Sequence, residues 1–111
     1  METPHTWLVV KIGKEDPFYK VFATWRGGYL DGDSWKMNSG IAKVEESDDT
    51  YDFYGESGSC YRCSKNGYGS SSYTQGVLDN VIEKAKEIGT VIEIMDIDTN
   101  WGDLLKKKEN I

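Results

Sequence analysis

The most reactive side chains of the sequence form a Cys-x-x-Cys pair, Cys60 and Cys63. Two thiols at this spacing can ligate zinc or cycle between a dithiol and a disulfide. Zinc needs four ligands, and only His5 and scattered carboxylates could complete the set within one chain, so a metal site would require two chains to share it. A redox pair usually opens a helix, whereas this pair lies in a predicted strand, where residues three apart face opposite sides. Structural cysteines are the favoured interpretation, with the metal and redox roles left open.

A loop rich in glycine and serine, residues 65–72, leads into the start of a predicted helix. Free backbone N–H groups at such a start favour an anion such as phosphate. The spacing matches neither a Walker A loop nor the full G-x-G-x-x-G pattern. The alternative to an ordinary capped loop is a nucleotide-binding site, whose candidate residues are Arg62, Lys65, Gly67, Tyr68, Gly69, Ser70, Ser71 and Tyr73.

Residues 96–102 carry oxygen ligands at alternate positions, as calcium loops do. The glycine comes one residue late, and Lys107 stands where a bidentate glutamate should close the cage, so an N-cap before a short helix is the better interpretation. Catalysis is poorly supported, because the one histidine is His5 and the carboxylates Asp31 and Asp33 lie in a turn with no apolar pocket evident. We therefore expect no catalytic residues, no cofactor and no enzyme.

Periodicity predicts the elements that position these residues. Apolar or alternating runs predict strands at 6–12, 18–25, 34–37, 41–46, 50–54, 59–64 and 90–97. Alternation in the second run predicts a central strand with Tyr19, Val21, Ala23 and Trp25 on one face and Phe18, Lys20, Phe22 and Thr24 on the other. Apolar residues at three- and four-residue steps from Tyr73 to Ile88 predict one long amphipathic helix, with a capping box at 72–75 and a left-handed stop at Gly89.

These elements predict an α+β fold, in which one long helix packs on one face of a mostly antiparallel sheet of about five to six strands. The 111 residues form a single domain, 1–111, with 1–5 and 106–111 expected as flexible ends. Residues 1–13 do not resemble a secretion signal, and no apolar run approaches the length of a membrane span. We expect a cytoplasmic protein that does not bind membranes.

Negative charge is concentrated in the middle of the chain. The formal net charge is -6, and residues 31–56 hold eight acids and two bases, which leaves the other 85 residues neutral. Such an acidic region repels nucleic-acid phosphate and attracts basic protein surfaces, so direct DNA binding is disfavoured. The simpler interpretation is that Glu45 to Asp49 is a solvated turn whose charge adds solubility.

Tyrosine outnumbers the other aromatic residues, with seven tyrosines against four tryptophans and three phenylalanines. These side chains either fill the core of a sheet with two aromatic faces or form a protein-binding surface beside the acids. The second interpretation gives a candidate partner-binding face made of Glu45, Glu46, Asp48, Asp49, Asp52, Tyr51 and Tyr54.

The sequence resembles small proteins of tailed phages at residues 25–29, 33–41 and 57–61 and at Tyr68-Gly69. The resemblance implies a host-takeover or counter-defence role in the host cytoplasm. The first hypothesis is a non-enzymatic inhibitor that blocks a host or defence protein through the acidic, aromatic-rich face. The alternative is a protein that binds or sequesters a nucleotide at the Gly67–Ser72 loop, and a third is a homodimer bridged through Cys60 and Cys63.

Overall fold

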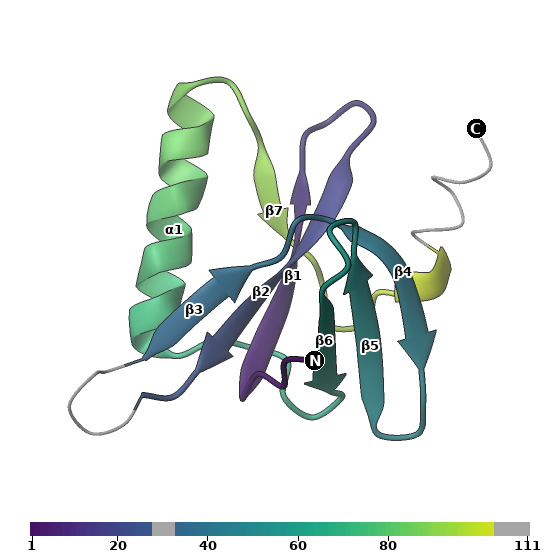
Figure 1. The fold of residues 1–111 in the computed structure, drawn as a ribbon. Helices are drawn as coiled ribbons and strands as arrows, with labels where there is room; N and C mark the ends of the chain where they lie inside the picture. The colour runs from purple at the N-terminus through teal and green to yellow at the C-terminus, as the bar shows by residue number, and fades with distance from the viewer. Residues whose placement is uncertain (28–32, 104–111) are drawn as a thin grey trace.

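The computed structural model describes residues 1–27 and 33–103 and confirms the α+β class. Each of the seven predicted strand ranges contains a strand in the described residues, but the strands divide between two antiparallel sheets and do not form the expected single sheet of about five to six strands. One face of the central sheet is covered by the helix and the other by the second sheet (Figure 1). The elements are β1 (Thr6–Ile12), β2 (Phe18–Trp25), β3 (Ser34–Met37), β4 (Ile41–Glu46), β5 (Thr50–Gly55), β6 (Cys60–Ser64), α1 (Ser72–Glu87) and β7 (Ile92–Ile94).

The central sheet has the order β3-β2-β1-β7. Strand β2 pairs with β1 and with β3, which confirms it as a central strand. Side chains alternate between the two faces as expected, because Val21 and Ala23 enter one hydrophobic cluster and Phe22 enters the other. Strand β1 alternates likewise, with Trp7 and Val9 on the first side.

The second sheet has the order β4-β5-β6 and packs on the Trp7 side of the central sheet. Its inward side chains include Phe53, Tyr61 and Cys63, all at most 4% exposed. The chain passes between the sheets at Asn38, whose backbone N–H donates to the Val21 carbonyl and whose Oδ1 accepts from the Val21 N–H at 2.8 Å. Both bonds fix the point where the chain leaves the central sheet, so the predicted meander becomes two layers.

Helix α1 covers the other face of the central sheet through Leu78 and Ile82. The capping box lies one residue earlier than predicted, because Ser71 is the N-cap and exchanges hydrogen bonds with Thr74 at N3. The Thr74 side chain is buried against Thr24, so packing as well as capping fixes the helix start. The predicted stop is confirmed, since Gly89 has a φ of +85°, a conformation that glycine adopts readily.

The last strand is shorter than the predicted 90–97, because β7 ends at Ile94. At this point the Tyr68 hydroxyl donates to the Met95 carbonyl at 2.5 Å and accepts from the Val9 N–H at 3.3 Å. The hydroxyl therefore bridges the Val9 N–H and the Met95 carbonyl, while the Met95 N–H still donates directly to the Val9 carbonyl at 2.8 Å. Residues 67–69 pair with the other half of this edge of β1, through two backbone hydrogen bonds to Trp7.

The first five residues, expected as a flexible end, make backbone hydrogen bonds to both sheets. Glu2 donates to the Cys60 carbonyl and accepts from the Arg62 N–H, while His5 donates to the Thr24 carbonyl. The predicted flexible end at 106–111 lies outside the described residues. Helix α1, the one long helix of the described residues, lacks the length and apolar content of a membrane-crossing helix.

Replacing Tyr68 with phenylalanine tests the bridge between β1 and the chain after β7. The substitution keeps the ring but leaves a half-buried N–H and C=O without their shared partner, so we expect the free energy of unfolding to fall by about 1–3 kcal/mol. Tyr73→Phe is the matched control, because the Tyr73 side chain is 61% exposed, and it should stay within about 0.5 kcal/mol of the unmodified protein. Urea denaturation measures both, and equal stability of the two variants would contradict the bridge.

Candidate functional site

The acidic segment folds as the β4–β5 hairpin, and its alternation divides the predicted contact residues between two faces. Glu45, Asp52 and Tyr54 belong to the outer face, which points away from the central sheet. Glu46 pairs with Tyr51 on the inner face, where the Tyr51 ring packs on the core. Asp48 and Asp49 lie in the turn between the strands and are exposed. The seven predicted residues thus do not form one continuous face.

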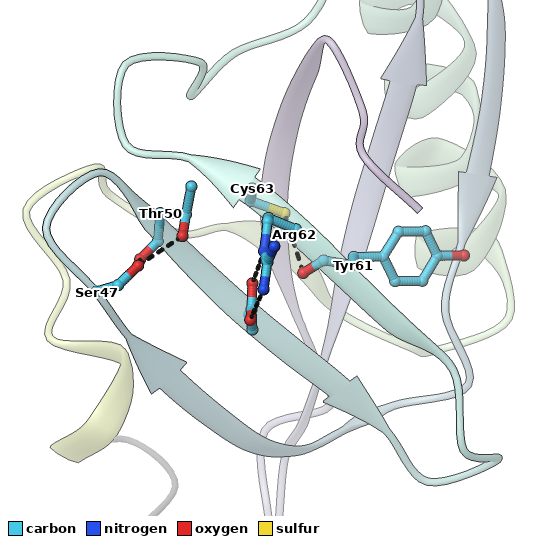
Figure 2. Close-up of polar contacts among 6 residues, drawn as sticks. Ser47, Thr50, Tyr61, Arg62 and Cys63 are labelled. Atoms are coloured by element: carbon cyan, nitrogen blue, oxygen red, sulfur yellow. Dashed lines mark hydrogen bonds and ion pairs between the residues drawn. The ribbon is translucent and has the colours of Figure 1, made fainter. Parts of the chain in front are cut away.

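An arginine from the neighbouring strand neutralises part of the negative charge on the outer face of the hairpin. Arg62 of β6 stands opposite Asp52 and donates two hydrogen bonds to its carboxylate, both of 2.9 Å (Figure 2). These hydrogen bonds hold the pKa of Asp52 below its ordinary value. Figure 2 also shows the turn of the hairpin, where the Ser47 and Thr50 hydroxyl groups lie 2.7 Å apart. Arg62, proposed from the sequence as a nucleotide ligand, is therefore an ion-pair partner within the sheet.

Two lysines pair with the glutamates of the hairpin. Lys43 lies 2.9 Å from Glu45, and Lys65 lies 2.6 Å from Glu46 and 5.0 Å from the centre of the Tyr51 ring. Within the described residues, Asp48 and Asp49 take part in no ion pair. Three of the five acids of the β4–β5 hairpin are thus paired after folding, and the two without an ion pair in the described residues, Asp48 and Asp49, lie at its tip.

A pocket of about 350 Å³ opens between the inner side of this hairpin and the loop after β7. Its position follows from Asn100, whose Oδ1 accepts from the Asp103 N–H at 3.1 Å and so confirms the predicted N-cap. The cap starts a helical turn that lies near β4 (Figure 1). Trp101 in this turn is 4% exposed and packs against the core. The pocket is lined by Val44, Glu46, Tyr51, Asp98, Thr99, Asn100, Trp101 and Gly102.

The two cysteines face opposite sides of β6, as the strand spacing predicts. Both thiols are free; Cys63 is buried in the core between the sheets, and Cys60 is half-buried on the outer face. Burial raises the pKa of both thiols, so neither is a ready thiolate nucleophile at neutral pH. A metal shared between two chains could reach only Cys60 without opening the core, and no group of three or more metal-ligating side chains gathers in 1–27 and 33–103.

The predicted nucleotide loop is used for packing. Gly67 lies so close to His5 that a Cβ there would stand 3.0 Å from the His5 carbonyl oxygen, which only glycine accommodates easily. Tyr68 is turned into the core, and Lys65 binds the hairpin. Tyr73 is exposed on α1 and contributes to neither. The structure therefore does not bring the predicted ligand residues together.

The Asp33 carboxylate lies beside Ser71, the residue that caps α1. Hydrogen bonds from the Ser71 hydroxyl and the Gly27 N–H lower the pKa of Asp33. Ser70 donates at 2.6 Å to the side chain of Gln75 in the first turn. An anionic ligand would have to compete with Asp33 at this position. Asp31, the other carboxylate considered for catalysis, lies outside the described residues.

Comparison with protein-family models gives no match, and no curated protein or solved structure matches at a significant level. The sequence pattern of residues 96–102 indicates a calcium loop or an N-capped turn and does not single out Asp98 or Trp101 as binding residues. The signal that could have combined them is an aromatic residue directly after an acidic, N-capped loop.

Thiol alkylation by iodoacetamide tests the cysteine environments. In the folded protein we expect Cys60 alone to react, with a rate that still rises above pH 8.5 because its raised pKa delays thiolate formation. Cys63 should react only after denaturation. The Cys60→Ser variant should lose the reaction of the folded protein. Two equally reactive thiols in the folded state, or a midpoint below pH 8, would contradict these assignments.

Proposed function

We propose that this chain is a non-enzymatic binding protein whose β4–β5 hairpin tip contacts a basic surface of another protein. The observation that carries the proposal is the distribution of charge after folding. Lys43, Arg62 and Lys65 pair with three of the hairpin acids, whereas Asp48 and Asp49 remain exposed without an ion pair in the described residues. Uncompensated charge at a protruding turn favours a complementary partner and accelerates its association.

The chemistry of the other candidate sites supports binding over catalysis. The thiols are held in the protonated form by burial, and the Nδ1 atom of His5 accepts a hydrogen bond from the Arg26 N–H at 2.7 Å. The nucleotide alternative receives less support, because its candidate residues do not gather at one place. Arg62 and Lys65 pair with acids of the hairpin, Tyr68 packs on the core, and Tyr73 is exposed on α1. The resemblance to phage proteins extends the proposal: the basic partner is a host or defence protein in the host cytoplasm, and the chain acts as its inhibitor.

Neutralising the hairpin tip tests the proposal. The partner would first be isolated by affinity capture from the cells in which the protein acts, identified, and purified. For the double variant Asp48→Asn, Asp49→Asn we expect the association rate at low salt to fall by about tenfold, with little change in the dissociation rate, because exposed charges mainly steer encounter. Surface plasmon resonance over a salt series measures both rates.

The matched control is the double variant Glu83→Gln, Glu87→Gln, which removes the same charge from exposed positions on α1. Its association rate should remain within about twofold of the unmodified protein. An equal loss in both double variants would show a bulk charge effect, and no loss in either would exclude the hairpin tip as the contact.

A further inference from the structure

The pocket between the hairpin and the loop after β7 is lined by both acidic and aromatic residues. Its lining includes two acidic residues, Glu46 on β4 and Asp98 in the loop, and two aromatic residues, Tyr51 and Trp101. Its volume of about 350 Å³ lies at the small end of ligand pockets, which suits one side chain or a similarly sized group. Carboxylates beside aromatic rings are the surroundings that favour an organic cation.

Two of these side chains, Glu46 and Tyr51, already contact a cation of this chain, the Lys65 ammonium group. The Lys65 ammonium lies 2.6 Å from Glu46 Oε2 and 5.0 Å from the Tyr51 ring centre, so it makes both an ion pair and a cation–π contact. Lys65 does not line the pocket, whereas Glu46 and Tyr51 do, so these two side chains can also contact a second cation inside the pocket.

Asp98 brings the second carboxylate and is not neutralised within the described residues. Its side chain is exposed and makes no ion pair or side-chain hydrogen bond in 1–27 and 33–103, while its backbone N–H donates to Asp96 Oδ1 at 3.1 Å. The neighbouring side chains are already used: Thr99 Oγ1 donates to the Asp96 carbonyl, and Asn100 caps the following turn. Asp98 and the second oxygen of Glu46 are therefore the acceptors free for a guest.

We propose that this pocket receives an arginine side chain from the basic surface of the partner, an inference that rests on the proposed function. A planar guanidinium can donate to two carboxylates at once and place its face on an aromatic ring, whereas an ammonium acts as a point charge. The pocket adjoins the hairpin tip through Glu46, so one basic surface can contact Asp48 and Asp49 and insert a side chain beside Trp101.

Titration with a blocked Gly-Arg-Gly tripeptide tests the pocket without the partner. We expect millimolar binding, seen as amide shifts at Thr99 and Gly102 and at the Trp101 indole N–H in proton–nitrogen correlation spectra. The peptide with citrulline in place of arginine keeps the shape without the charge and should not bind. The lysine peptide should bind at least about threefold more weakly.

The Asp98→Asn substitution should lower the affinity for the arginine peptide by at least about fivefold, since it removes the free carboxylate. Glu83→Gln removes the same charge from α1 and should leave the affinity unchanged. Equal binding of the citrulline peptide, equal effects of the two variants, or equal affinity for lysine would overturn the arginine assignment. Binding that emerged only after Lys106, Lys107 and Lys108 were changed to glutamine would assign the pocket to this chain's own sequence and would also overturn it.

The two tests fail separately. Peptide binding at the pocket together with an unaffected Asp48→Asn, Asp49→Asn variant would refute the hairpin tip and keep the cation pocket. A slower association of the Asp48→Asn, Asp49→Asn variant, together with no peptide binding, would refute the arginine pocket and keep the hairpin tip as the contact.

Discussion

The indole of Trp7 lies where the two sheets and the chain after β7 meet. Its ring centre is 4.7 Å from that of Tyr68, 5.4 Å from Phe53 and 6.0 Å from both Tyr51 and Trp101, so five aromatic rings from four segments of the chain pack around one point. Its Nε1–H donates to the Ser64 carbonyl at 2.7 Å, and its backbone binds Gly67 and Gly69. Burial of these large rings is the main driving force that holds the second sheet on the first.

This aromatic cluster also determines where the candidate binding groups lie. Tyr51 and Trp101 both pack against Trp7 and both line the pocket, so the packing that stabilises the fold also positions the pocket. The hairpin tip projects beyond the cluster, where its acids avoid the cost of desolvation. A rigid base with an exposed charged end suits binding, because little conformational entropy is lost when a partner docks.

Much of the fold could be predicted from the sequence, and much less of the site. Strands β1 to β4 were predicted with their observed bounds, because their apolar alternation and glycine or acidic turns are local signals. The strand after α1 was predicted too long, since its end is set by the Tyr68 hydroxyl, 27 residues away from Met95 in the chain. The acidic face was predicted from linear charge density, which does not show that Arg62 and Lys65 return to the hairpin on β6 and in the loop after it.

The sequence by itself determined which segments become strands or helix, which side chains share a face, and that Cys60 and Cys63 point to opposite sides of one strand. These properties depend on the periods of 2 and 3.6 residues and on capping and turn residues, which act over a few positions. Only the tertiary structure decided which acids keep their charge uncompensated, that Tyr68 serves the core, and that Asp98 meets Glu46 across a pocket. Those outcomes depend on pairs such as Arg62 with Asp52 and Trp7 with Trp101, whose distances are set by how the layers pack.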